Sequence, residues 1–126
     1  MNKTERRFKR SVNTTRALCL QLKASVNKGQ LDGMVLADDE GVCLAAAGDT
    51  DACQEIAAQL PLVGRKVPQF AGVLFGDASA WDIAIRRIEL LGSELYLCAI
   101  GDSLSRQDQL ERSVGGVSRI LLPKAA

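Results

Sequence analysis

Histidine is missing from this sequence of 126 residues, and several classes of enzyme are excluded with it. Without an imidazole, no Ser-His or Cys-His pair can activate a nucleophile. The chain also lacks the G-x-x-x-x-G-K-S/T and G-x-G-x-x-G segments that usually bind phosphates and dinucleotides. We therefore expect a protein that is not an enzyme, with no catalytic residues and no cofactor.

Aromatic residues make up 4% of the chain, and long apolar runs are missing as well. A surface for single-stranded nucleic acid interleaves basic and aromatic side chains, and no stretch here does so. No uncharged run approaches the ~20 residues that cross a bilayer, and no apolar leader follows the first residue. We expect a cytoplasmic protein with no nucleic-acid partner.

Neither the cysteines nor the acidic residues are spaced as metal ligands. No C-x-x-C pair occurs, so we expect reduced thiols in an apolar core. The run Asp38-Asp39-Glu40 suits a hard cation, but three adjacent acids in a tight turn point in different directions, and no further ligands follow at calcium-loop spacing. We predict no metal site. The cysteines are Cys19, Cys43, Cys53 and Cys98.

The net charge of +1 conceals two charged regions. Residues 1–16 hold six bases and one acid, whereas residues 38–55 hold six acids and no base. The simplest interpretation is two solvated faces. The alternative is that these regions steer a partner. They could also pair two copies of the chain, with the basic region of one copy against the acidic region of the other.

Residues 3–27 have the apolar spacing of an amphipathic helix with basic flanks. Gly29 is expected to end this helix in a left-handed conformation. Leu20 points away from the apolar stripe and suits a partner surface. The stripe consists of Phe8, Val12, Cys19, Leu22 and Val26, with Leu18 at its edge.

A short hairpin and a helix are predicted next. Gly41 is placed for the left-handed residue of the turn between the two strands. Asp49 or Thr50 can cap the helix, and Pro61, which lacks a helical donor, should kink it. Residues 70–76 fit either an edge strand or a packed loop. The predicted strands are 34–37 and 42–46, and the predicted helix is 51–66.

Residues 83–100 read as the main hairpin, and its second arm, apolar at nearly every position, suits a central strand covered on both faces. In the first arm the apolar alternation changes phase between Ile85 and Ile88. A one-residue slip would turn every following side chain to the other face, so we predict a β-bulge at Arg86-Arg87.

The last helix is predicted to begin at Ser105, which opens a capping box, and its apolar stripe ends at Leu121. Gly115 and Gly116 lie off this stripe and cost roughly 1 kcal/mol each relative to Ala. Either the helix is weak there or another backbone approaches closely. Antiparallel strands with helices packed on them predict an α+β layer fold with four to five strands.

Residues 31–45 resemble the opening hairpin of the Roadblock / dynein light chain family, in which an apolar strand ending in Asp meets a turn Gly and a strand ending in small residues. The resemblance continues to about residue 122. We expect residues 30–126 to be a Roadblock-like domain. Residues 1–29, an N-terminal amphipathic basic helix in the same unit, resemble an extension found in bacterial members that serve Ras-like GTPases in cell polarity and motility.

The resemblance implies a five-stranded antiparallel sheet in the order α-β-β-α-β-β-β-α, without catalytic activity. Family dimers commonly join edge strands across a two-fold axis and pack their central helices together. The expected function is therefore a homodimeric adaptor that binds another Roadblock-type protein or a regulator in a Ras-like GTPase system.

Two alternatives remain open. The first is a GTPase-activating partner that reshapes the switch loops of a Ras-like GTPase; Arg86, Arg87 and Arg106 are the arginines to test for it. The second is a module for an anionic membrane surface or a small ligand, using the basic helix.

The expected partner interface is an exposed edge strand. Its proposed residues are Trp81, Asp82, Ile83 and Ile85, together with Leu20. The competing interpretation is that Trp81 covers the core, since large aromatic side chains usually bury most of their surface.

Overall fold

The structure is a computed structural model, and it describes residues 12–122 of the chain. The order of elements, α-β-β-α-β-β-β-α, is the predicted one. The predicted start of the first helix, residues 3–11 with Phe8, lies outside the described residues. The elements are α2 (Val12–Gly29), β1 (Gly33–Ala37), β2 (Cys43–Gly48), α3 (Thr50–Gly64), β3 (Gln69–Phe75), β4 (Ala80–Leu90), β5 (Ser93–Ile100) and α4 (Arg106–Leu121).

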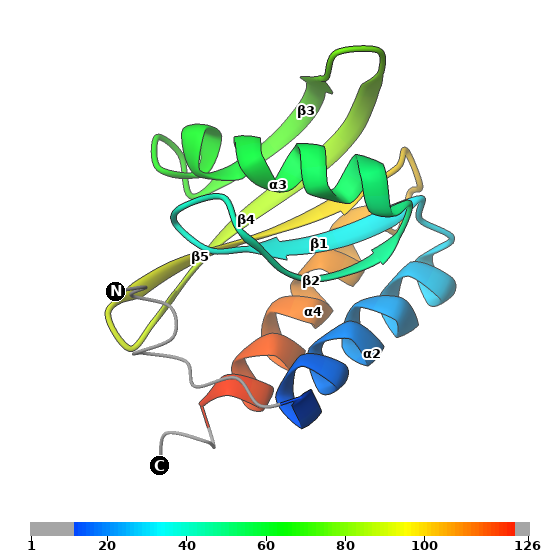
Figure 1. The fold of residues 1–126 in the computed structure, drawn as a ribbon. Helices are drawn as coiled ribbons and strands as arrows, with labels where there is room; N and C mark the ends of the chain where they lie inside the picture. The colour runs from blue at the N-terminus through cyan, green and yellow to red at the C-terminus, as the bar shows by residue number, and fades with distance from the viewer. Residues whose placement is uncertain (1–11, 123–126) are drawn as a thin grey trace.

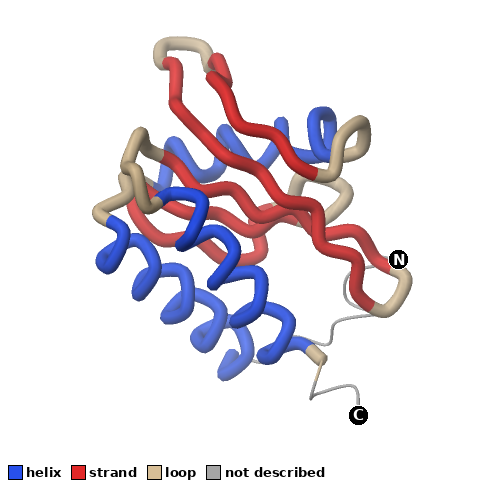
Figure 2. Tube along the Cα trace, turned by 180° about the vertical axis from the view of Figure 1, so that it is seen from behind, coloured by secondary structure: helices blue, strands red, loops and turns tan. Residues whose placement is uncertain are grey.

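The five strands form one antiparallel sheet in the order β2-β1-β5-β4-β3. Helix α3 covers one face, and α2 and α4 lie side by side over the other (Figures 1 and 2). One apolar cluster, with Ile56 and Ile85, fills the interface under α3, and another, with Leu22 and Leu110, lies under α2 and α4. Strand β5 is buried almost throughout, as predicted for a central strand.

Strand β4 pairs with β5 without a break in register, so the predicted bulge at Arg86-Arg87 is wrong. Both faces of β4 are covered. Ile85 packs in the cluster under α3, whereas Ile88 packs in the cluster under α2 and α4. The apolar positions change phase because the two parts of the strand contribute their large side chains to opposite faces.

The structure decides three features of the middle of the chain. Residues 70–76, which fit strand or loop, belong to β3, which pairs with β4 along its length. Asp49 is the cap of α3, and its carboxylate accepts the N–H of Ala52 at 3.0 Å. Pro61 lies buried inside α3, which continues past it and ends at Gly64, two residues earlier than predicted.

The buried face of α2 differs from the predicted stripe. Leu18, expected at its edge, is fully buried, while Val12 is 76% exposed. The left-handed residue after the helix is Gln30, with φ of 54°, and not Gly29. Gly29 meets a different requirement, since a Cβ there would lie 2.6 Å from the Gln109 side chain of α4.

The predicted capping box at the start of α4 is also wrong. The Ser105 hydroxyl does not cap α4; it donates to the carbonyl of Gly29 at 3.0 Å and joins α4 to the end of α2. Gly116 faces α2, where a Cβ would lie 2.3 Å from Gln21. The close approach is thus made by a side chain, not by a backbone. A Cβ on Gly115 would meet nothing nearer than 3.4 Å.

Candidate interaction surfaces

Strand β3 ends the sheet and pairs with β4 alone, so one of its edges faces no strand within residues 12–122. The N–H of Arg87 donates to the carbonyl of Pro68 at 2.9 Å, which places the even-numbered residues of β3 in hydrogen-bonding positions toward β4. Ala71 and Val73 therefore direct their N–H and C=O groups to the open edge. Such an edge is a template for pairing with another chain.

The side chains of β3 divide between a covered and an exposed face. Leu74 is buried in the cluster under α3, and Phe70 packs against the same cluster. On the other face Val73 is 46% exposed and Phe75 is 73% exposed, since α4 packs over β4 and β5. Exposed apolar side chains therefore lie beside the open edge.

Helix α3 is tied to the far end of β3. The Gln59 amide donates to the carbonyl of Phe75 at 3.2 Å, and the Glu55 carboxylate accepts the N–H of Asp77 at 2.8 Å. Leu62 on the same helix is 64% exposed. A partner that pairs with β3 would therefore meet α3 as well.

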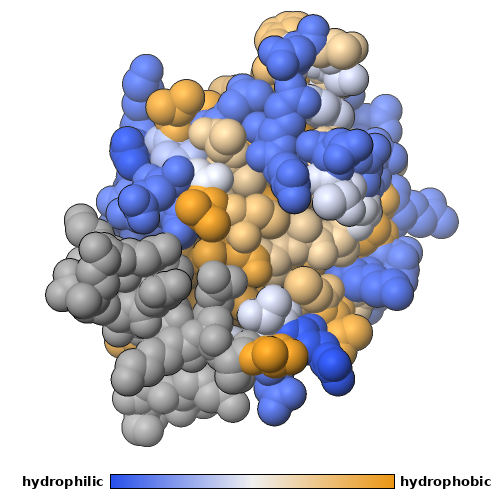
Figure 3. Space-filling view, in the orientation of Figure 1, coloured by the Kyte–Doolittle hydropathy of each residue, from blue (hydrophilic) through white to orange (hydrophobic). Residues whose placement is uncertain are grey.

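Helices cover both faces of the opposite edge strand, β2. Both α2 and α3 pack against β2, whereas α3 packs against β3. Figure 3 shows apolar surface in the middle of the face seen in Figure 1, between α3 and α2 where β2 runs, with polar side chains around it. Strand β2 carries mainly small residues, including Ala46 and Ala47, which are partly buried. Helices thus cover both faces of β2, whereas one face of β3 carries the exposed Val73 and Phe75.

The residues predicted for an edge-strand interface lie on β4, between β5 and β3, so their placement at an edge is wrong. Ile83 and Ile85 are buried under α3, and Trp81 packs partly buried against the same cluster. Asp82 is exposed. Leu20 on α2 is 59% exposed, in agreement with its predicted position. Contact of these residues with a partner stays a prediction.

The three arginines considered for a GTPase contact are each bonded within the chain. Arg86 forms an ion pair with Glu111 of α4. Arg87 donates to two carbonyls at the C-terminal end of α3, at 3.2 and 3.3 Å. Arg106 donates to the carbonyl that follows β5, at 2.8 Å. Their contact with a GTPase stays a prediction, and it would compete with these bonds.

Three buried groups, Cys53, Tyr96 and Cys98, are held in their protonated forms near neutral pH. Burial raises the pKa of Cys53 to about 11 and also raises the pKa of Cys98, so neither thiol is a nucleophile near neutral pH. Burial and a 2.6 Å hydrogen bond to Glu94 raise the pKa of Tyr96 to about 12. Among residues 12–122, no three His, Cys, Asp or Glu side chains are grouped as metal ligands would be.

Comparison with solved structures defines the class of fold. The chain is similar to a Roadblock/LC7 domain from Streptomyces avermitilis, with 15% identity, a TM-score of 0.55, and coverage of 86% of this chain and 98% of that one. The chain therefore has a Roadblock-like fold, as the sequence resemblance implies. No protein-family model matches the chain, and no curated protein matches its sequence.

Two structures of MglB have a similar fold. MglB of Myxococcus xanthus is 11% identical, with a TM-score of 0.61 and coverage of 90% of this chain and 94% of that one. The gliding protein MglB of Thermus thermophilus is 12% identical, with a TM-score of 0.60 and coverage of 90% and 95%. At these identities the likeness establishes the fold.

A helix that spans a membrane is both long and apolar. Within residues 12–122, no helix combines the length and the apolar composition that crossing a bilayer requires.

Proposed function

We propose that this chain is a non-catalytic, cytoplasmic, homodimeric adaptor in a small Ras-like GTPase system that controls cell polarity or motility. It acts by binding another Roadblock-type protein or a regulator of that system. The observation that carries the proposal is the open edge of β3 beside the exposed side of α3. The Roadblock-like fold, which the gliding protein MglB also has, supports the setting.

In the proposed homodimer, β3 and α3 of each copy meet across a two-fold axis. The two β3 strands pair antiparallel through the backbone groups of Ala71 and Val73. Each hydrogen bond formed contributes about 0.5–1.5 kcal/mol, and covering the exposed Phe75 side chain adds about 1.5–3 kcal/mol. The α3 helices, tied to the strands by Gln59, then pack together.

An adaptor role is supported by the state of the polar groups. Arg86, Arg87 and Arg106 are bonded within the chain, and the buried thiols are protonated. Two α3 helices beside a continuous sheet would present a broad surface with two equivalent halves. Such a surface holds a second protein by shape and hydrogen bonding, without a chemical step.

Light scattering at micromolar concentrations tests the homodimer with a matched pair of variants. Val73 and Val42 are both 46% exposed, the first at the open edge of β3 and the second in the turn before β2. Val73→Lys places a charge at the proposed two-fold contact and should weaken the dimer at least about tenfold, while Val42→Lys should leave it unchanged. A monomeric wild-type protein, or equal weakening by both variants, would overturn the proposal.

A further inference from the structure

Helices α2 and α4 enclose a groove that the proposed homodimer does not use. The helices run antiparallel along it, with Gly29 near Gln109 and Gln21 near Gly116. The groove has a volume of about 490 Å³. Its lining includes Gln21, Ser25 and Lys28 of α2, and Arg112, Gly115 and Arg119 of α4.

The groove is open because small residues face it. Ser25 is buried at the junction of the helices, where its hydroxyl lies 2.6 Å from the hydroxyl of Ser113. The approach of Gln21 leaves no room for a side chain at Gly116. Gly115 has no such requirement, since a Cβ on residue 115 would meet no atom nearer than 3.4 Å. A glycine inside a helix costs about 1 kcal/mol relative to Ala. Gly115 thus weakens α4 without relieving a clash. The atom nearest to such a Cβ belongs to the Arg119 guanidinium, so Gly115 leaves space in the groove beside that group.

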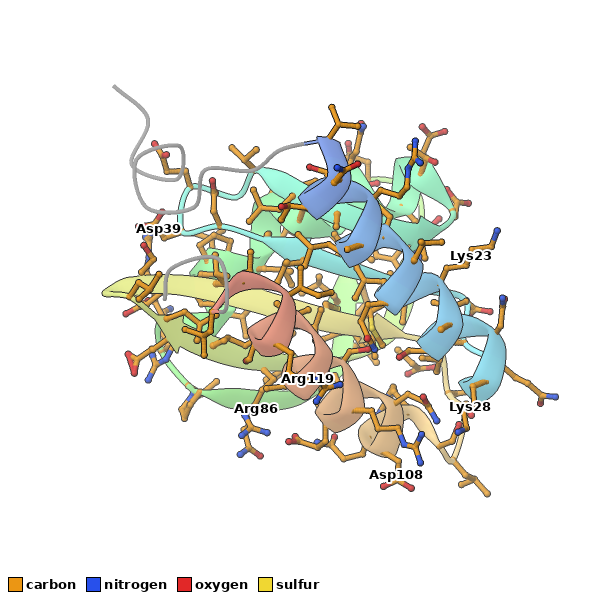
Figure 4. The ribbon with its side chains drawn as sticks, turned by 90° about the horizontal axis from the view of Figure 1, so that it is seen from below. Lys23, Lys28, Asp39, Arg86, Asp108 and Arg119 are labelled. Carbon is orange, nitrogen blue, oxygen red and sulfur yellow. The ribbon has the colours of Figure 1, made fainter. Side chains whose placement is uncertain are left out.

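The unpaired charges along the groove are basic. Within residues 12–122, no hydrogen bond or ion pair joins Lys28, Arg112 or Arg119 to another residue, whereas the Glu111 carboxylate beside them is paired with Arg86. Figure 4 shows Lys28 on α2 and Arg119 on α4, seen from the side of the molecule that these two helices cover.

The charges on α2 are also basic. Over its described length α2 contains Arg16, Lys23 and Lys28 and no acidic residue. Of these three bases, Lys28 lines the groove, whereas Lys23 points away from α4 (Figure 4). A ligand with carboxylates in the groove would therefore gain mainly from Lys28, Arg112 and Arg119. Arg112 and Arg119 are seven residues apart on α4, which corresponds to about 10.5 Å along the helix.

We propose that this groove binds an acidic helical segment of another polypeptide, with Asp or Glu side chains paired to Lys28, Arg112 and Arg119. Two carboxylates seven residues apart on a helix match the spacing of the two arginines. Ser25 and Gln109, both buried, also line the groove, and the Gln109 amide can offer hydrogen bonds to a ligand there. A bilayer is flat and does not reach into a groove between two helices, so the geometry favours a protein segment over a membrane surface.

The test uses a helical peptide of Ala and Gln with glutamates at every seventh position, and the same peptide with Gln in place of Glu. Binding is followed by fluorescence anisotropy and by amide chemical shifts of the full chain. We expect the acidic peptide to shift amides of α2 and α4 around the groove, with an affinity that falls as salt is added. The Gln peptide should not bind.

The decisive variant is Gly115→Leu, which fills the groove without changing charge and improves the helix propensity of α4. It should weaken binding at least about tenfold, and Arg119→Glu should do the same. Gly115→Ala checks that residue 115 tolerates a side chain and should retain binding. Lys66→Glu, an exposed base after α3, is the charge control and should leave binding unchanged.

Three results would overturn the proposal. The first is an acidic peptide that does not bind, or binds equally to the Gly115→Leu variant with its fold intact. The second is equal loss in Arg119→Glu and Lys66→Glu, which would indicate general attraction of charge. The third is binding to phosphatidylserine vesicles in place of the peptide. Because Val73→Lys alters β3 and not the groove, failure of the homodimer and failure of this site are distinguishable.

Discussion

Gly64, the last residue of α3, lies against the ring of Tyr96, which is fully buried on β5. A Cβ on residue 64 would lie 2.3 Å from a ring carbon of Tyr96. The C-terminal end of α3 can therefore approach the sheet because residue 64 has no side chain. The same close contact helps to keep the Tyr96 hydroxyl beside Glu94.

Replacing two glycines should change stability in opposite directions. Gly64→Ala forces a methyl group into the Tyr96 ring and should lower the free energy of unfolding by about 1–3 kcal/mol. Gly115→Ala meets no close atom and should raise it by about 0.5–1 kcal/mol. Urea denaturation measures both. A shift of the two midpoints in the same direction would contradict this account of the packing.

The phenol of Tyr96 should lose its proton at a higher pH than an ordinary tyrosine. Tyr96 is the one tyrosine of the sequence, so tyrosinate absorbance reports it directly. Its pKa in the folded protein is about 12, against an ordinary value of 10.0. The folded protein keeps this proton when the unfolded chain has released it, so stability should fall as pH rises between these two values. Glu94→Gln, which removes a neighbouring charge, should lower the midpoint; a native midpoint at the ordinary value would contradict the burial of this side chain.

Among the elements, β4 shows how two neighbouring residues of one type acquire different roles. Arg86 reaches α4 on one face of the sheet, and Arg87 reaches the C-terminal end of α3 on the other. The carbonyls at a helix C-terminus carry partial negative charge and have no intrahelical partner. Strand β4 thus connects both helical layers, one through each arginine.

The two arginines should differ when replaced. Arg87→Ala leaves carbonyls at the end of α3 without their donor and should cost about 1–2 kcal/mol of unfolding free energy. Arg86→Ala removes a partly exposed ion pair and should cost about 0–1 kcal/mol. Thermal or urea unfolding of the two variants shows which of them loses more stability. A larger loss in Arg86→Ala would show that the bonds to α3 contribute little.

The order of elements and the α+β fold could be predicted from the sequence, because periodicity and turn residues are local signals. The position of β4 inside the sheet could not, since strand order depends on contacts between distant segments. For that reason the phase change near Arg86 suggests a bulge, and Ile83 and Ile85 suggest an edge, until the neighbouring strands are known. One residue of the sequence indicates the groove between α2 and α4. This residue is Gly115, a glycine inside a helix that no close contact requires.

At the scale of the whole molecule, β3 lies at the end of the sheet, whereas α2 and α4 form a layer over one of its faces (Figure 2). The open edge of β3 and the groove lined by α2 and α4 are therefore separate surfaces. A protein with two such surfaces can hold two partners at the same time. This arrangement fits the proposed adaptor better than an enzyme, in which polar groups converge on one site.

The adaptor and the GTPase-activating alternative make different predictions for GTP turnover. We expect a Ras-like GTPase from the same cell to be retained by the immobilised chain, directly or through a second protein, while its rate of GTP hydrolysis stays unchanged. The bonds of Arg86, Arg87 and Arg106 within the chain argue against a direct contribution of these arginines to hydrolysis. An unchanged rate would also exclude reshaping of the switch loops. Faster hydrolysis on addition of the pure protein would favour the alternative.

The pairing of two copies through β3 is tested most directly by amide hydrogen exchange at several protein concentrations. The N–H groups of Ala71 and Val73 face the open edge, whereas that of Leu74 faces β4. The account predicts that protection of Ala71 and Val73 rises with concentration, in step with the dimer seen by light scattering, while Leu74 is protected throughout. A dimeric sample in which Ala71 and Val73 exchange as freely as in the dilute monomer would contradict it.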